Sequence, residues 1–296
     1  SFYGLLASEK VGRPLTPDLA GTPIAWQGAP VFENDIVQAA LILLAGGERG
    51  AAFTFFAQLG QTLSASELAQ LGAYLTEIDE QYYALLLGKT AVTRGILIPA
   101  IYYPIHDLAE MDLPADPTLS LSIARRESEF NETIGSPVGA LGLMQVMPAT
   151  AREVAGDLGL PYAQGRLTND WQYNATLGAA YLAYLEEEFG PSPVMIAAGY
   201  NAGPSRPRSW MDERGDPRLL EMDVVDWIEH IPFRETRNYV MRVTESIPIY
   251  EARLTGRAGP VRFTELLIGQ KPLLRPRARP ASVVAPAFDV RPIARP

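Results

Sequence analysis

Apolar residues recur every three or four positions through most of the chain, which is the spacing of amphipathic α-helices. Over residues 35–87 the pattern is interrupted at 46–47 and again near 60–64, so it predicts short consecutive helices. Ser64 and Glu67 stand at the spacing of a capping box, which marks the start of one of them. We therefore predict a mainly α-helical fold whose first part is a set of helical hairpins, a packing platform rather than a partner groove.

A second helical pattern begins at Asp116, whose carboxylate can accept amide hydrogens of a first turn. Pro117 suits the next position because its missing N–H is not needed there. Counting i, i+3, i+4 and i+7 from Ser120 places one acidic residue, Glu127, in a largely apolar stripe. The predicted stripe consists of Ser120, Ile123, Ala124, Glu127, Phe130 and Asn131.

Glu127 is the candidate for acid–base chemistry in this helix. Burial disfavours the charged form of a carboxyl group and raises its pKa, which is the property a general acid needs near neutral pH. Glu129 falls about 200° away on a 3.6-residue repeat, beside Arg125 and Arg126, and is expected to be solvated and salt-bridged. A buried structural Glu with a local hydrogen bond remains an equal alternative for Glu127 from helical phase alone.

The residues around Glu127 carry a family resemblance. The motif ES at 127–128 is followed by SPVGA at 136–140, GLMQ at 142–145 and MP at 147–148. This sequence resembles the signature of the soluble lytic transglycosylases, which share a goose-type-lysozyme-like catalytic domain that can include a small irregular β element. The resemblance implies that Glu127 is catalytic and that four residues contact the substrate's N-acetyl group or shape the cleft: Ser136, Gly142, Gln145 and Met147.

Residues 200–204, YNAGP, resemble the aromatic-Asn-Ala-Gly motif of the same family. The resemblance implies that Tyr200 points its hydroxyl toward the catalytic carboxyl group and the sugar, and that Asn201 also binds substrate. Gly199 and Pro207 depart from the family pattern, so they affect the expected path of this loop. A core tyrosine with a hydrogen-bonded hydroxyl is the alternative for Tyr200.

Residues 231–240, IPFRETRNYV, contain a third motif of the family. By this resemblance Glu235 lies in the cleft and binds saccharide hydroxyls or the attached peptide. Pairing of Glu235 with Arg234 or Arg237 on a solvated helix face is the alternative.

The resemblance also implies the reaction. Lytic transglycosylases use one Glu to protonate the bridging oxygen between N-acetylmuramic acid and N-acetylglucosamine, and then to activate the sugar's own 6-hydroxyl, which gives a 1,6-anhydro end. A hydrolytic lysozyme with a second carboxylate is one alternative, for which Asp170 and Asp226 are candidates. A non-catalytic wall-binding or scaffold protein is the other.

The composition of the chain restricts the classes of partner and cofactor that we expect it to bind. A formal charge of −9 argues against nucleic acid as the main partner, and no apolar run approaches the ~18 residues of a membrane span. The chain has no cysteine, and His106 and His230 have no second histidine at metal spacing, so we expect no cofactor and no metal. The resemblance implies peptidoglycan strands and muropeptides as partners, and leaves an envelope-assembly partner open. It also implies a periplasmic location reached with a signal peptide absent from this chain.

These patterns suggest four segments. Residues 1–31 are expected to end a truncated helical-repeat region, 32–108 to form a helical linker domain, and 109–255 to form the lysozyme-like catalytic domain. Residues 256–296 contain eight Lys or Arg against two acidic residues and many prolines, which predicts an extended basic tail. A solvated tail or a strap along the surface is favoured over contact with the acidic remainder of the protein or with anionic wall polymers.

Overall fold

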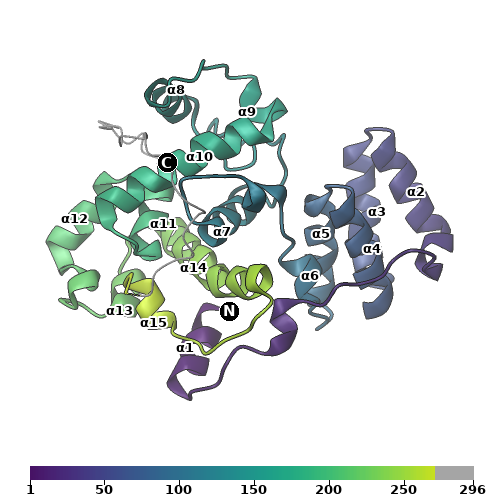
Figure 1. The fold of residues 1–296 in the computed structure, drawn as a ribbon, viewed down its shortest axis with the longest axis horizontal. Helices are drawn as coiled ribbons and strands as arrows, with labels where there is room; N and C mark the ends of the chain where they lie inside the picture. The colour runs from purple at the N-terminus through teal and green to yellow at the C-terminus, as the bar shows by residue number, and fades with distance from the viewer. Residues whose placement is uncertain (271–296) are drawn as a thin grey trace. The chain divides into compact units, whose positions relative to one another are not determined.

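The computed structural model describes residues 1–270, and every regular element in that range is a helix (Figure 1). Fifteen α-helices and four short 3₁₀ helices succeed one another, and no β-strand occurs among the described residues. Two isolated antiparallel bridges, Gly135 to Leu141 and Leu141 to Val146, are the extended contacts within this range. The prediction of a mainly α-helical fold is confirmed.

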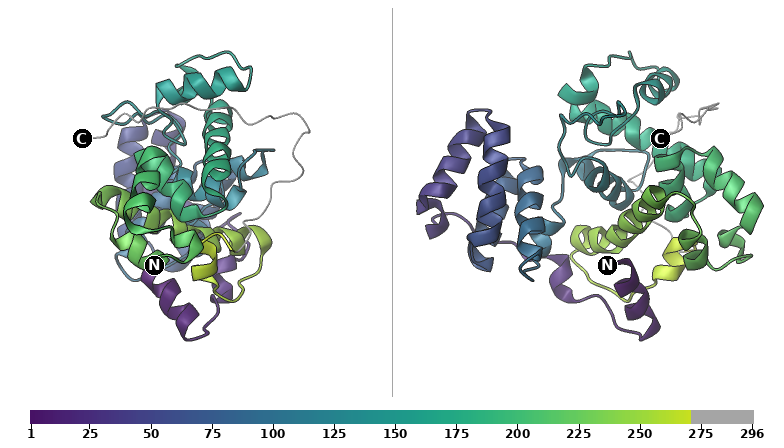
Figure 2. Two further views of the ribbon diagram at one scale, coloured as in Figure 1. Left: turned by 90° about the vertical axis from the view of Figure 1, so that its left-hand side faces the viewer. Right: turned by 180° about the vertical axis from the view of Figure 1, so that it is seen from behind.

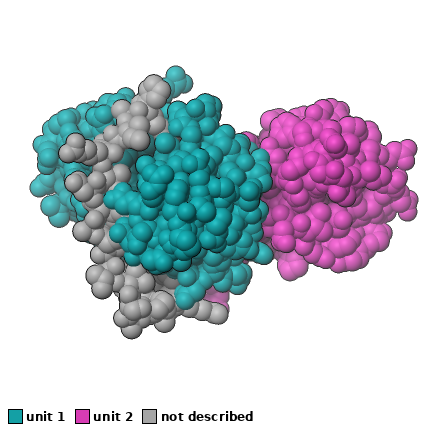
Figure 3. All heavy atoms as spheres, turned by 90° about the horizontal axis from the view of Figure 1, so that it is seen from above, with its two compact units in different colours: residues 1–15, 107–251, 259–296 teal, residues 16–106, 252–258 magenta. Residues whose placement is uncertain are grey.

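The chain divides into two compact units (Figure 3). The first unit comprises residues 1–15, 107–251 and the described residues from 259, and the second comprises residues 16–106 and 252–258.

The second unit is a set of helical hairpins with its own apolar core (Figures 1 and 2). Asn34 caps its first long helix with two side-chain hydrogen bonds, and Ser64 with Glu67 forms the predicted capping box. Phe56 and Tyr83 pack inside it with ring centroids 4.9 Å apart. The helices are η1 (Pro17–Ala20), η2 (Pro30–Glu33), α2 (Asp35–Ala45), α3 (Arg49–Thr62), α4 (Ala65–Glu77), α5 (Gln81–Val92) and α6 (Pro99–Tyr102).

The first unit contains the segment with the family motifs. The longest helix that lies wholly within this unit is α10 (Trp171–Phe189). Eleven of its residues are buried, and it packs against α11 (Pro193–Ala202). The remaining elements are α1 (Phe2–Lys10), η3 (Asp107–Glu110), α7 (Pro117–Glu127), α8 (Pro148–Asp157), α9 (Arg166–Asn169), α12 (Ser205–Arg214), η4 (Pro217–Leu219), α13 (Val224–Glu229), α14 (Arg234–Thr255, whose last four residues are assigned to the second unit) and α15 (Phe263–Leu267).

The predicted start of α7 is confirmed. Helix α7 begins at Pro117, and Oδ1 of Asp116 accepts the backbone N–H groups of Thr118 and Leu119. Helix α8 begins at Pro148, as its proline predicts.

The two ends of the described chain meet in the first unit. Helix α1 packs against α15, with the rings of Phe2 and Phe263 5.3 Å apart, and Glu9 accepts a 2.6 Å hydrogen bond from the hydroxyl of Thr264. Phe263, Leu266 and Leu267 are buried, so the prediction of an extended tail from residue 256 is wrong for this stretch. The sequence FTELL has the apolar spacing of a helical turn, which the surrounding prolines and basic residues obscured. The remainder of the expected tail, 271–296, lies outside the described residues.

No helix within residues 1–270 is long and apolar enough to cross a membrane. The same residues contain no group of three or more His, Cys, Asp or Glu side chains that could hold a metal ion.

Candidate active site

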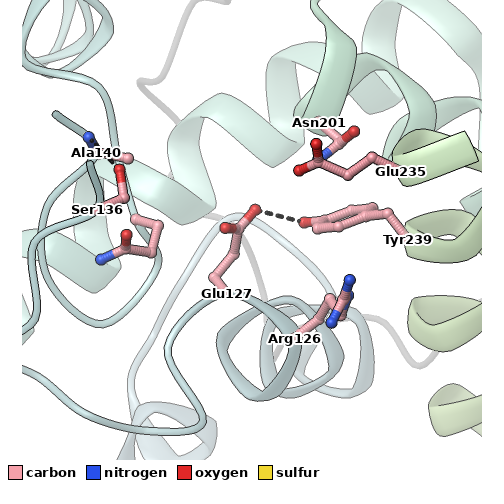
Figure 4. Close-up of a pocket in the computed structure, with 8 residues that line it drawn as sticks. Arg126, Glu127, Ser136, Ala140, Asn201, Glu235 and Tyr239 are labelled. Carbon is pink, nitrogen blue, oxygen red and sulfur yellow. Dashed lines mark hydrogen bonds between the residues drawn. The ribbon is translucent and has the colours of Figure 1, made fainter. Parts of the chain in front are cut away.

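A polar pocket opens in the first unit where α7, the loop after it, α11 and α14 meet (Figure 4). Its volume is about 180 Å³. Residues far apart in the sequence line it: Arg126, Glu127, Ser136, Ala140, Gln145, Asn201, Glu235 and Tyr239.

Glu127 is the last residue of α7, and its side chain points into the middle of this pocket. The helix ends there because Glu129 and Phe130 take positive φ angles of 56° and 67°. The predicted stripe therefore stops at Glu127, and the expected position of Glu129 on the opposite helix face is wrong. No glycine or proline marks this end, so no local stop signal predicts it. Glu127 is half-buried at a polar opening, not enclosed in an apolar stripe.

Tyr239 of α14 holds the Glu127 carboxyl group. The hydroxyl of Tyr239 donates a 2.8 Å hydrogen bond to Oε1 of Glu127. Burial raises the pKa of Tyr239 well above its ordinary value, and the negative charge of Glu127 raises it further. Tyr239 is consequently protonated near neutral pH and acts as a hydrogen-bond donor to Glu127.

The loop after α7 forms the opposite wall of the pocket. Oγ of Ser136 accepts the backbone N–H of Ala140 at 2.9 Å. Nε2 of Gln145 donates to the carbonyl groups of Ile134 and Gly142 at 3.0 and 2.9 Å. Ser136 and Gln145 thus brace the loop and also line the pocket.

Gly142 fits a position that no larger residue can occupy. Its φ is +74°, and an added Cβ would lie 1.8 Å from the carbonyl oxygen of Leu167 and 2.4 Å from Nδ2 of Asn174. This glycine shapes the cleft through the backbone and does not itself line the pocket.

Asn174, a buried residue of α10, holds the same loop in place by hydrogen bonds to backbone groups. Its Oδ1 accepts the N–H of Met144 at 2.8 Å, and its Nδ2 donates to the carbonyl groups of Leu141 and Leu167 at 2.8 and 2.9 Å. Ser128 adds a link from the end of α7, because its hydroxyl donates a 2.6 Å hydrogen bond to the carbonyl of Leu143. The carboxyl group and the facing loop are therefore held in one hydrogen-bonded framework.

The YNAGP segment lies at the end of α11. The hydroxyl of Tyr200 donates to the carbonyl of Met144 at 2.8 Å, which ties this helix to the loop. Oδ1 of Asn201 accepts a 2.7 Å hydrogen bond from the hydroxyl of Thr236, and Asn201 lines the pocket.

Glu235 lies on the first turn of α14, is exposed and lines the pocket with Tyr239, which follows it by one helical turn. The alternative partner Arg237 donates instead to the carbonyl of Glu229 at 2.9 Å. Glu235 is thus a second carboxylate at the pocket that contains Glu127.

Five of the eight predicted site residues line the pocket, namely Glu127, Ser136, Gln145, Asn201 and Glu235. Among the described residues, Gly142, Met147 and Tyr200 do not belong to that lining; Met147 is instead the residue before α8. Three lining residues were not singled out from the sequence, Arg126, Ala140 and Tyr239. Tyr239 was accessible to prediction, because it stands four residues after Glu235 and therefore on the same helix face.

Asp170 and Asp226, the second carboxylates considered for a hydrolase, do not line the pocket. Asp170 caps α10, accepting the N–H of Tyr173 at 2.9 Å, and forms a 2.8 Å ion pair with Arg166. Asp226 lies within the short helix α13. Neither residue is therefore placed to act as a second carboxylate in this pocket.

A helical fold, a carboxyl group at a helix end and a facing glycine-containing loop define the class of helical, lysozyme-like domains. Residues 109–219 match the family described as the transglycosylase SLT domain. The chain is 30% identical over 247 residues to the soluble lytic murein transglycosylase of Salmonella typhimurium, covering 82% of this chain and 37% of that protein. The Escherichia coli K12 enzyme of the same name is 33% identical over 192 residues, or 64% of this chain and 29% of that protein.

Solved structures agree with these sequence matches. The 70 kDa soluble lytic transglycosylase from Escherichia coli superimposes with a TM-score of 0.70 at 27% identity, covering 86% of this chain and 41% of that one. An inactive Glu-to-Gln mutant of the lytic transglycosylase Slt from Pseudomonas aeruginosa gives a TM-score of 0.66 at 28% identity, with the same coverage. The chain contains an SLT domain and is a homologue of the soluble lytic murein transglycosylases. It spans about a third of the length of the curated relatives it matches.

Proposed function

We propose that this chain is a peptidoglycan lytic transglycosylase. It cleaves the β-1,4 bond between N-acetylmuramic acid and N-acetylglucosamine and leaves a 1,6-anhydro-N-acetylmuramic acid end. Glu127 is the acid and then the base. The observation that supports this most strongly is the placement of Glu127 in a polar pocket with the Tyr239 hydroxyl donating to it at 2.8 Å.

In the first step Glu127 donates a proton to the bridging oxygen, so that the bond from C1 of the muramic acid to this oxygen breaks. The carboxyl group becomes a carboxylate, and the Tyr239 hydrogen bond stabilises the charge that forms. In the second step the carboxylate takes the proton of the sugar's own 6-hydroxyl, whose oxygen closes onto C1. Glu127 regains its proton and no water is consumed.

The loop and helix ends around Glu127 supply the positioning that this reaction requires. Ser136 and Ala140 lie on one side of the carboxyl group, and Asn201 and Glu235 lie on the other (Figure 4). An acid–base group contributes about two to four powers of ten in rate. Orientation of the sugar between these two walls accounts for much of the remainder.

Hydrolysis is the second candidate, because Glu235 places another carboxylate at the same pocket. In that mechanism Glu235 would activate a water molecule or form a covalent intermediate, as paired carboxylates do in glycosidases. The product would then carry a reducing end. A purely binding or scaffold role would leave the glycan uncut.

A digest of purified peptidoglycan distinguishes these functions. We expect the wild-type protein to release muropeptides with anhydro ends, and Glu127→Gln to release none. Glu129→Gln is a matched control, since Glu129 lies two residues away and outside the pocket lining. Products heavier by one water would instead establish a hydrolase, and uncut strands with all forms would leave binding as the function.

The substrate also supports a location. The relatives are named for murein, so we infer that this chain acts in the bacterial periplasm after export, on glycan strands and muropeptides. Fractionation of cells, with detection of the protein in the periplasmic fraction, tests this inference.

A further inference from the structure

Arg126 supplies positive charge to a pocket that contains two carboxylates, Glu127 and Glu235. It is exposed, and its side chain lies on the same side of Glu127 as Tyr239, whereas Ser136 and Ala140 lie on the other side (Figure 4). Its guanidinium carbon is 5.8 Å from the centre of the Tyr239 ring. Because Arg126 precedes Glu127 directly on α7, the end of this helix fixes both groups together.

Across residues 1–270, the guanidinium of Arg126 makes no hydrogen bond or ion pair with another group, and its cation–π contact is with the face of the Tyr239 ring. A guanidinium presents five N–H donors in a planar fork that matches a carboxylate. A cation with open donors at the rim of a saccharide pocket is therefore suited to an anionic group of the ligand.

The chemistry of the proposed substrate provides such a group. N-acetylmuramic acid carries a lactyl substituent that ends either in a free carboxylate or in a peptide that itself carries carboxylates. Glu235, and Glu127 whenever it is ionised, would repel a substrate carboxylate, and the whole chain has a formal charge of −9. Among the pocket-lining residues Arg126 is the cation, so the attractive position for that carboxylate is beside it.

We propose that Arg126 forms a carboxylate-binding subsite that selects muramyl units by their lactyl-linked carboxylate and sets which sugar lies over Glu127. This inference rests on the proposed function, because it identifies the part of the substrate that the pocket recognises. Arg126 is a specificity residue here and takes no part in proton transfer.

Binding to a catalytically disabled protein tests the subsite without requiring turnover. In the Glu127→Gln background, the dissociation constant is measured by calorimetry for three tetrasaccharides. The first is a neutral chitin oligomer, the second a peptide-free muramyl glycan with free lactyl carboxylates, and the third a peptide-bearing muramyl glycan. For each tetrasaccharide, the dissociation constant of the Glu127→Gln protein is compared with that of the protein that also carries Arg126→Gln. Arg152→Gln is the matched control, because Arg152 is also exposed over a tyrosine ring, 4.9 Å from the centre of Tyr162, but outside the pocket lining.

We expect Arg126→Gln to weaken binding of at least one carboxylate-bearing glycan roughly tenfold, the loss typical of an exposed charge-assisted contact, and to change binding of the chitin oligomer less than twofold. A loss confined to the peptide-free glycan identifies the lactyl carboxylate, and a loss confined to the peptide-bearing glycan identifies the stem peptide. Equal losses for all three ligands, or no loss for any, would overturn the proposal.

These outcomes are independent of the reaction type. If the wild-type protein gave reducing ends, the proposed transglycosylase function would fail, while the binding comparison would still report on Arg126. Thermal unfolding of both arginine variants, with an expected change within a few degrees, confirms that each is folded.

Discussion

The hydroxyl of Tyr239 and the carboxyl group of Glu127 are 112 positions apart in the sequence and 2.8 Å apart in space. This hydrogen bond joins the end of α7 to the first turns of α14, so it both orients the carboxyl group and links two walls of the pocket. The predictions below start from this contact.

Replacing Tyr239 with Phe removes the donor and keeps the ring. We expect kcat for glycan cleavage to fall about 10–100-fold, because a hydrogen bond to a charged group is worth about 1.5–3 kcal/mol. The measurement is the initial rate of release of soluble muropeptides. Tyr162→Phe serves as control, since its buried hydroxyl has no hydrogen-bond partner among the described residues and lies outside the pocket lining. Equal rates for the two variants would contradict a role for this contact.

Asn174→Ala removes three hydrogen bonds that fasten the loop facing Glu127. The buried N–H of Met144 and the carbonyl groups lose their partners, so we expect the free energy of unfolding to fall by about 2–4 kcal/mol. Denaturant unfolding measures it. Asn169→Ala, at an exposed position on α9, should change stability by less than about 0.5 kcal/mol. A similarly small effect at Asn174 would show that the loop is held by other contacts.

Gly142→Ala adds a methyl group where the carbonyl oxygen of Leu167 is 1.8 Å away. Because that oxygen belongs to the backbone, the loop must move, and we expect a loss of about 3 kcal/mol or more in stability together with loss of cleavage. Gly139→Ala is the comparison: its φ is also positive, at +91°, but its Cβ would meet no atom within 4 Å. Its expected cost is about 1 kcal/mol. A Gly142→Ala protein as stable as Gly139→Ala would exclude the predicted clash.

Asp116, the cap of α7, is expected to make stability depend on pH. Burial raises its pKa from the ordinary 3.8 to about 6, against the lowering effect of its hydrogen bonds to Thr118 and Leu119. Since the folded protein holds this proton more tightly than the unfolded chain, the associated stability is fully present below pH 3.8 and is lost as pH rises through about 6.

The difference between a pKa of 3.8 and one of about 6 limits the total change in unfolding free energy from this group to about 3 kcal/mol. Asp116→Asn keeps an acceptor oxygen at the cap but removes the titration, so we expect a flatter curve of unfolding free energy between pH 4 and 7. Asp157→Asn, an exposed residue at the end of α8, controls for the change in net charge. Curves for wild type and Asp116→Asn that run parallel would contradict this account of the cap.

Local sequence patterns were sufficient to predict the helices and some of the residues that line the pocket. The Asp116–Pro117 start, the Ser64–Glu67 capping box and the helical fold depend on interactions within a few residues, and they are confirmed. The motifs also named five of the lining residues. The hydrogen bonds of Asn174 to the loop and of Tyr239 to Glu127 were missed, because both depend on how α10 and α14 pack. Local spacing places Tyr239 on the helix face of Glu235 but does not predict its partner. The end of α7 at Glu127 was missed for a different reason: two positive φ angles occur at residues that are not glycine.

The most direct test of the central claim is digestion of peptidoglycan in water enriched in 18O, followed by mass spectrometry of the glycan ends. If Glu127 directs the sugar's own 6-hydroxyl onto C1, the new ends are anhydro, one water lighter than reducing ends, and carry no 18O. Wild type should give these ends and Glu127→Gln none. New reducing ends that carry 18O would show that water is the nucleophile, and would contradict the account.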